Sequence, residues 1–137
     1  MGGSHFRGTV SSEVKALTGI TTCCASRRAF AIIANGRIKA WGDSDYGSNA
    51  QSVSGVTNAS RLIATESAYT AILSGGKIVC WGNSTYGNDL PESYKVLTDI
   101  IDVKSTYGAF AALRANGSVI TWGNSNYGGI VCPSVLV

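Results

Sequence analysis

NGSVITWGNSNYG, at residues 116–128, is the stretch that decides the fold, because it occurs in three copies in the 137-residue chain. The earlier copies read NGRIKAWGDSDYG at residues 35–47 and GGKIVCWGNSTYG at residues 75–87. Their tryptophans lie 40 residues apart (81 − 41) and then 41 residues apart (122 − 81). Similarity at a fixed period of this length indicates stacked repeats, in which each unit buries its core against its neighbours.

Each copy predicts a β-hairpin. Short runs rich in Val, Ile, Thr and aromatic residues are separated by glycines, and no segment keeps the 3.6-residue apolar period of a helix. Asn35-Gly36 and Asn116-Gly117 predict type I′ turns, since that turn needs positive φ at both central residues, and Gly75-Gly76 meets the same need. A further strand precedes each hairpin, as at residues 100–104. The sequence therefore predicts an all-β fold of short antiparallel strands.

The first copy is one residue shorter than the others. Six residues separate its leading aromatic residue from its turn glycine (36 − 30), against seven in the other two copies (76 − 69 and 117 − 110). The missing residue falls between Phe30 and Asn35. We therefore expect a shortened or bulged strand at this point.

The composition narrows the class of protein. Hydrophobic residues make up 45% of the chain and charged residues only 14%, which is not the composition of a disordered chain. The net charge of +3 is mild and its basic residues are not clustered, so nucleic acid is not an expected partner. No apolar run is long enough to span a membrane, and we expect no membrane association.

The sequence predicts neither an enzyme nor a metal or cofactor site. The four cysteines have no C-x-x-C spacing, and the single histidine, His5, cannot complete a zinc site with them. No histidine is placed to activate Cys23 or Cys24. Asp43 and Asp45 form an acidic pair in the first copy only, which argues against a repeated metal site. Cys80, just before Trp81, is predicted to be an inert packing residue.

The repeat pattern, aromatic-Ala-x-Leu-x-x-(Asn/Gly)-Gly-x-(Val/Ile)-x-x-Trp-Gly-x-Ser-x-Tyr-Gly, resembles the regulator-of-chromosome-condensation (RCC1) repeat. The period and the short Trp-Gly-Asn-Ser-x-Tyr-Gly tail resemble the compact bacterial variety, as in β-lactamase inhibitor protein II. The resemblance implies a β-propeller, with blades at about residues 10–47, 48–87 and 88–129. Residues 1–9 are interpreted as a leader, and residues 130–137 as a linker or the start of a next repeat.

Three blades are fewer than the ~4–8 of a propeller and leave two open ends. Two arrangements would close these ends. Two copies could form a six-bladed ring by homodimerisation, through a head-to-tail contact that closes by rotation. Alternatively, the chain could be a segment of a longer parent chain. We expect the homodimer, because an ordered three-bladed piece is otherwise hard to explain.

The residues common to all copies are predicted to be structural. Repeated tryptophans that end a strand are more often core aromatic residues than ligand platforms. The glycines of the hairpin turns allow tight backbone geometry. The residues in this structural set are Trp41, Trp81, Trp122, Gly36, Gly76 and Gly117.

A second set of residues is predicted to lie on loops at one rim of the propeller. In proteins that resemble the inhibitor, this rim is the binding surface, and tyrosines make good protein contacts at a low cost in entropy. The Asx residue three positions before each tyrosine can instead hold the turn by itself. The arginine pair could bind an acidic partner or only aid solubility. The residues in this set are Arg27, Arg28, Asp43, Asp45, Tyr46, Tyr86 and Tyr127.

The function predicted from these features is a non-enzymatic protein-binding or scaffolding module that presents its rim loops to an unknown protein partner. A lectin-like propeller that binds glycans through aromatic loop residues is the alternative. Guanine-nucleotide exchange, which the eukaryotic namesake of the repeat performs, has no identifiable motif here.

Overall fold

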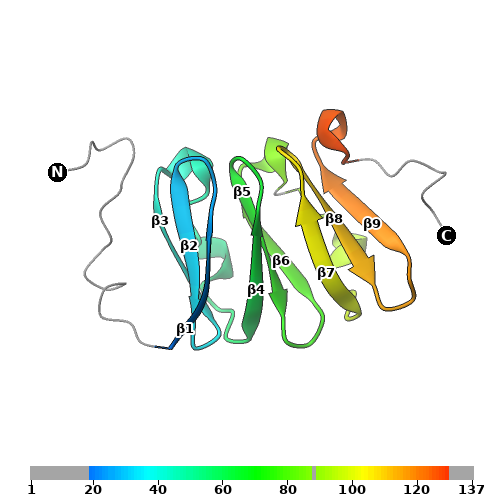
Figure 1. Ribbon diagram of the computed structural model, residues 1–137, viewed down its shortest axis with the longest axis horizontal. Coiled ribbons are helices and arrows are strands. Elements are labelled where there is room, and N and C mark those ends of the chain that lie inside the picture. Colours follow the sequence, from blue (N-terminus) through cyan, green and yellow to red (C-terminus); the bar gives the residue numbers. More distant parts are fainter. Residues whose placement is uncertain (1–18, 88, 130–137) are drawn as a thin grey trace.

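The computed structural model describes residues 19–87 and 89–129, which form three antiparallel three-stranded sheets standing side by side (Figure 1). We call these sheets blades 1, 2 and 3. The predicted leader, residues 10–18, Cys132 and residues 130–137 lie outside the described residues. The strands are β1 (Ile20–Ala25), β2 (Ala29–Ala34) and β3 (Arg37–Gly42) in blade 1; β4 (Ala59–Ala64), β5 (Ala68–Leu73) and β6 (Ile78–Gly82) in blade 2; and β7 (Ile100–Ser105), β8 (Ala109–Arg114) and β9 (Val119–Gly123) in blade 3.

Short helical turns lie in the linkers that follow the blades. Three of them follow the last strand of a blade, and these are η1 (Ser44–Tyr46), η3 (Ser84–Tyr86) and η4 (Ser125–Tyr127). The linkers also contain η2 (Gln51–Val53) and a single α-helical turn, α2 (Glu92–Lys95). The sequence did not predict α2, because four residues are too few to show a helical period. Pro91 precedes the helix, where its fixed φ starts the turn without loss of a hydrogen bond. No described helix is long and apolar enough to cross a membrane.

The hairpin turns correct two predictions. Asn35 and Gly36 have φ of 52° and 79°, as the predicted type I′ turn requires. In blades 2 and 3 only the second residue of the predicted pair, Gly76 or Gly117, has positive φ, and the turn is one residue longer. The extra residue therefore lies in the turn and not in the strand. This is a three-residue hairpin loop with its last residue in the left-handed region.

The shortened or bulged strand predicted between Phe30 and Asn35 is not present. β2, β5 and β8 have six residues each, and β2 pairs with β3 without a register shift. The first strand of every blade has the irregularity instead, as between Ile20 and Thr22. The one-residue deletion left the strand of blade 1 intact because the loop absorbed it, which costs less than disrupting a paired strand.

Each blade has two different faces, and these faces build the core. The aromatic face carries the stacked pair of the second and third strands, such as Tyr69 and Trp81 in blade 2. The aliphatic face carries the small and branched residues at alternate positions, such as Ala31, Ile33 and Ile38 in blade 1. The aliphatic face of blade 1 packs on the aromatic face of blade 2. The aliphatic face of blade 2 packs in the same way on the aromatic face of blade 3, around Phe110 and Trp122, so the repeats stack in one direction.

The two outermost faces have no neighbouring sheet in the described part of the chain. On the aromatic face of blade 1, Phe30 is 44% exposed, whereas the equivalent Tyr69 and Phe110 are 0% and 1% exposed. A small buried cluster of Ile32 and Ala34 with Trp41 lies further along that face. The fold class is therefore the predicted one, all-β with propeller-type blades.

Candidate functional site

The loops at one end of the three blades form a continuous surface, which we call the rim. It consists of the Asx-capped turns η1, η3 and η4 and of the turns at residues 26–28, 65–67 and 106–108, which lead into β2, β5 and β8 (Figure 1). The hairpin turns that contain Gly36, Gly76 and Gly117 lie at the opposite end of the blades.

Side chains hold the backbone of each Asx-capped turn. The Asp43 carboxylate accepts a hydrogen bond from the Asp45 amide at 2.9 Å. The Asn83 and Asn124 side chains do the same two residues on, at 2.8 and 2.9 Å. This is the geometry in which an Asx residue replaces one turn of backbone hydrogen bonding. The conformation of these loops is thus set by their own sequence.

A hydroxyl latch, which sequence reasoning missed, ties the two kinds of rim loop together. A Ser or Thr directly after the first strand donates to the carbonyl oxygen of the rim tyrosine, and the bond is 2.6 Å long in every blade. The pairs are Ser26 with Tyr46, Thr65 with Tyr86, and Thr106 with Tyr127. The signal was present in the sequence as a hydroxyl residue 20 or 21 positions before each tyrosine. The latch fixes the position of the tyrosine backbone before any partner binds.

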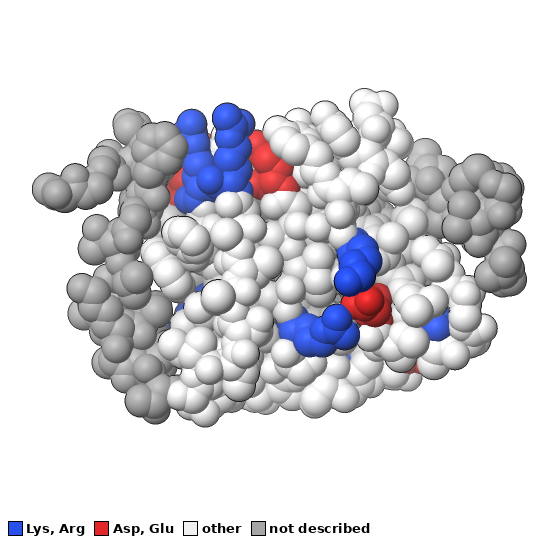
Figure 2. All heavy atoms as spheres, in the orientation of Figure 1, with Lys and Arg blue, Asp and Glu red and all other residues white. Residues whose placement is uncertain are grey.

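The rim over blade 1 is charged (Figure 2). The Arg28 guanidinium lies 5.3 Å from the centre of the Tyr46 ring and 4.0 Å from the Asp43 carboxylate. Arg27 is more exposed and pairs with Glu66 of blade 2 at 3.4 Å. This hydrogen bond is the main cause of the raised pKa of Arg27. Four of the predicted residues of the rim set are therefore brought together here.

The rim over blades 2 and 3 is aromatic. Tyr86 and Tyr127, both predicted from the sequence, have ring centres 6.3 Å apart. Tyr107 lies against both, at 5.8 Å from Tyr86 and 5.1 Å from Tyr127. Sequence reasoning missed Tyr107 because it is not part of the repeat pattern. The Glu66 carboxylate raises the pKa of Tyr107, and it thereby links this tyrosine cluster to Arg27 on the charged side.

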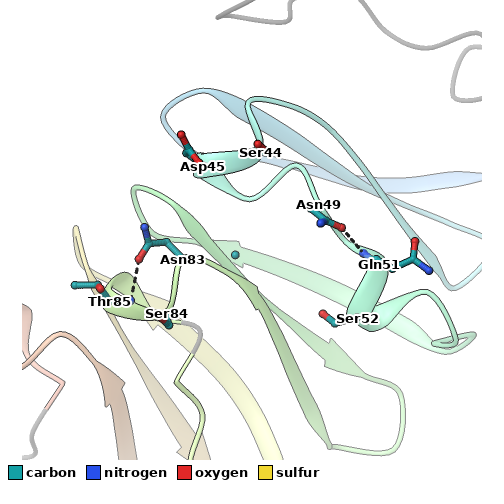
Figure 3. Close-up of a pocket in the computed structure, with 9 residues that line it drawn as sticks. Ser44, Asp45, Asn49, Gln51, Ser52, Asn83, Ser84 and Thr85 are labelled. Atoms are coloured by element: carbon teal, nitrogen blue, oxygen red, sulfur yellow. Dashed lines mark hydrogen bonds between the residues drawn. The ribbon is translucent and has the colours of Figure 1, made fainter.

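A polar groove of about 770 Å³ lies between the rim turns of blades 1 and 2 (Figure 3). Ser44 and Asp45 line it from η1, and Asn83 and its two neighbours line it from η3. The remaining wall comes from the segment at residues 49–52. Its side chains are amides, hydroxyls and one carboxylate, without an aromatic residue. Such a groove offers hydrogen bonds and little apolar surface.

The nucleophilic and metal-binding chemistry of the described residues is limited. They contain no group of three or more His, Cys, Asp or Glu side chains that could hold a metal ion. Cys23, Cys24 and Cys80 are free thiols. Burial raises the pKa of the Cys24 thiol, and burial raises that of Cys80 to about 12. Both thiols therefore stay protonated at neutral pH, and a protonated thiol is a poor nucleophile.

The repeated tryptophans lie in the blades and not on the rim surface. Trp81 and Trp122 are buried in the two junctions between blades, and Trp41 is half-buried on the outer face of blade 1. The Trp81 indole donates a hydrogen bond to the carbonyl oxygen of Gly47 at 3.0 Å. The equivalent indole nitrogens of Trp41 and Trp122 are buried without a hydrogen-bond partner.

The chain is similar in structure to known propeller-type proteins. It matches the entire ectodomain of the receptor kinase CR4 from Physcomitrella patens with a TM-score of 0.59 and 17% identity, over 76% of this chain and 29% of that one. It matches the CRINKLY WD40 ectodomain of the Arabidopsis thaliana receptor kinase ACR4 with a TM-score of 0.56 and 16% identity, over 76% and 38%. Human WBSCR16 matches with a TM-score of 0.56 and 16% identity, over 76% and 33%.

These matches define the class of fold, a set of propeller-type blades. The chain spans well under half of the length of each of these structures. No protein-family model matches the chain, and no curated protein matches it in sequence.

Proposed function

We propose that the chain is a non-enzymatic protein-binding module built from repeats of the compact RCC1 type, and that it binds a protein partner through the rim. One observation carries the proposal. The hydroxyl latches and Asx caps hold every rim loop in place, while the side chains of Arg27, Tyr107 and Tyr127 remain exposed on them. A surface that is ordered before binding loses little entropy on binding.

The side chains of the rim are those that dominate protein interfaces. Tyrosine and arginine are enriched among the residues that contribute most to binding free energy. Tyr107 and Tyr127 are 48% and 39% exposed and form one cluster with Tyr86. The tyrosine cluster would form the centre of the contact, and the ion pairs around Arg27 and Arg28 would set the orientation of the partner.

A display experiment tests this function without a known partner. A library of small folded binding domains would be selected against the immobilised protein, and each binder would be measured against Tyr107→Ala and Tyr127→Ala. We expect binders to concentrate on the rim and to lose about tenfold or more in affinity with either variant. Lys77→Ala, in the exposed turn at the opposite end of blade 2, is the matched control and should change nothing. Binders that concentrate elsewhere would contradict the proposal.

Glycan binding is the second candidate function, because the polar groove between blades 1 and 2 is lined by amides and hydroxyls that can bond to sugar hydroxyls. A glycan array separates the two candidates. If the groove binds glycans, specific glycans on the array should bind to the protein, and Asn83→Ala should reduce their affinity. The tryptophan fluorescence should not respond, since Trp81 and Trp122 are buried in the junctions and the half-buried Trp41 does not line the groove.

A further inference from the structure

The two outermost faces of the described part of the chain have the residue positions of the two sides of an internal junction. The aromatic face of blade 1, which we call the head face, has the same residue positions as the faces of blades 2 and 3 that receive a neighbour. The aliphatic face of blade 3 is called the tail face. Its residues are equivalent in position to those with which blades 1 and 2 pack on the next blade. Each end therefore has a binding surface that the other end matches.

Apolar residues of the two end faces are exposed at positions whose equivalents are buried in the internal junctions. On the tail face, Leu113 is 38% exposed, although the equivalent Ile33 and Ile72 are 0% and 5% exposed. On the head face, Phe30 is the exposed counterpart of two fully buried rings. The stack of Phe30 on Trp41, 5.6 Å between centres, matches the stacks in the two internal junctions. The head face is thus already shaped to receive an aliphatic face.

Backbone hydrogen bonds also cross the internal junctions at fixed positions. Along the rim, the Arg27 amide donates to Glu66 and the Glu66 amide donates to Tyr107, both at 2.9 Å. At the opposite end, the turn glycine carbonyls of Gly36 and Gly76 accept from the first strand of the next blade, at 2.9 and 3.1 Å. In a further junction of this kind, the Tyr107 amide would donate to the Arg27 carbonyl, and the Gly117 carbonyl would accept from the Ile20 amide.

A tryptophan indole also donates a hydrogen bond across one of the internal junctions. Trp81 of blade 2 donates to the carbonyl of Gly47 in blade 1. The Trp41 indole nitrogen of the head face is buried without a partner, and Gly128 of the tail face is the equivalent of Gly47. A buried donor without an acceptor costs free energy, which a bond to the Gly128 carbonyl would remove. Trp122 does not make the corresponding bond, so this contact forms in one of the two internal junctions.

In the described part of the chain, no further blade packs on the turn that contains Gly117, next to the tail face. A Cβ added to Gly36 or Gly76 would clash with a carbonyl oxygen of the next blade, that of Thr57 or Thr98. A Cβ added to Gly117 meets nothing within 4 Å. The two internal turns need glycine because another blade packs on them. The third turn has the same glycine and no such neighbour in the described part of the chain.

We propose that a second copy of this chain binds here, with the head face of each copy on the tail face of the other. Two such junctions join two copies into a closed ring of six blades, a number within the usual range of ~4–8 for propellers. The contact is heterologous and closes by rotation, so both ends of both copies are covered. A second copy is the occupant that the molecule itself specifies, since the end faces repeat the positions of its own internal junctions.

Two lysines make this junction weaker than the internal ones. Lys39 on the head face replaces Val79 and Ile120 of the equivalent strands, and Lys104 on the tail face replaces Cys24 and Ile63. Lysines on exposed sheet surfaces oppose uncontrolled association. The ring should therefore form and dissociate reversibly with protein concentration.

Sedimentation of the purified 137-residue chain over a wide range of concentrations tests the ring. We expect a reversible equilibrium between the chain mass of 14.2 kDa and twice that mass. Gly117→Asn should weaken the dimer about tenfold or more, because its Cβ enters the space of the incoming carbonyl, while asparagine tolerates the positive φ. Gly75→Asn is the matched control, since its Cβ also meets nothing within 4 Å and it lies in an internal turn. A monomer at all concentrations overturns the proposal.

Mixing two variants distinguishes the head-to-tail arrangement from a face-to-face dimer. Phe30→Asp blocks the head face and Leu113→Asp blocks the tail face, so each variant alone should be monomeric. An equimolar mixture retains one intact junction and should give an open heterodimer of reduced affinity. Circular dichroism of each monomeric variant confirms that it is folded. A homodimer that survives either substitution overturns the head-to-tail contact.

Discussion

The two internal junctions have the same apolar packing and different polar contacts. In both, an aromatic ring stacks on a tryptophan, with centres 5.0 Å apart for Tyr69 and Trp81 and 5.5 Å apart for Phe110 and Trp122. In the junction of blades 1 and 2, the Tyr69 hydroxyl accepts from the Ser26 amide and donates to the Ala29 carbonyl, both at 2.9 Å. Phe110 has no hydroxyl to do this.

The junction of blades 2 and 3 is held by polar contacts near the surface instead. The Ser105 hydroxyl donates to the Ala64 carbonyl at 2.6 Å, and Arg61 pairs with Asp102 at 2.7 Å. The Trp122 indole faces the Cys80 sulfur, a weak acceptor, without a hydrogen bond of regular geometry. The repeat therefore fixes the stack of rings, whereas the hydrogen bonds and ion pairs differ between the two junctions.

The tryptophans should give the largest difference between the junctions. Trp81→Phe removes apolar contact and a buried hydrogen bond, and we expect a loss of about 3 kcal/mol in the free energy of unfolding. Trp122→Phe removes a similar apolar contact but a nitrogen that has no regular partner, so the loss should be smaller, about 2 kcal/mol. Urea unfolding followed by circular dichroism measures both. Equal losses would show that the Gly47 hydrogen bond does not distinguish the junctions.

Alkaline pH should destabilise the junction of blades 2 and 3 through Cys80. Burial raises the pKa of this thiol from 9.0 to about 12. The folded state therefore keeps a proton that the unfolded state loses, so this contribution is complete below pH 9 and falls as the pH rises toward 12. At pH 10.5 the expected loss is roughly 2 kcal/mol.

Cys80→Ala is the control for the alkaline effect, because Ala40 occupies the equivalent position in blade 1. The variant should lose less stability than the wild-type chain between pH 8 and pH 10.5. Burial also raises the pKa of Tyr69, so a loss of the same sign should remain above pH 10 in the variant. Parallel pH profiles for the two proteins would exclude Cys80 as the cause.

Tyr69→Phe makes the first junction resemble the second. The Ala29 carbonyl loses the hydroxyl that donates to it, although the Ser26 amide keeps its hydrogen bond to that carbonyl at 3.0 Å. The ring itself still packs, so we expect a loss of about 1 kcal/mol. Thermal unfolding at pH 7 measures this loss. Phe110→Leu, which removes the ring stack of the second junction, should cost more if apolar packing is the shared contribution.

The period and the hairpin signals predicted the sheets, since both depend on residues that are close in sequence. They did not predict the length of the second and third turns, because the order Gly-Gly or Asn-Gly fits two turn types. Tyr107 and the hydroxyl latch were missed for a different reason. Tyr107 belongs to the tyrosine cluster only because blade 3 places it beside Tyr86 of blade 2. Contacts between blades depend on which face of one blade packs on which face of the next, and the repeat pattern in the sequence does not predict this.

The smallest expected effect tests the surface contact that distinguishes the second junction. The Arg61 side chain is 51% exposed, and pairs of this kind contribute about 0.2–1 kcal/mol. A double-mutant cycle with Arg61→Ala and Asp102→Ala should give a coupling of about 0.5 kcal/mol that decreases as salt is raised. Arg27 and Glu66, which pair across the first junction, provide the matched cycle. A coupling near zero, with Arg61→Ala still destabilising by itself, would mean that Arg61 acts through its hydrogen bond to the Ile101 carbonyl and its packing, and not through its charge pair with Asp102.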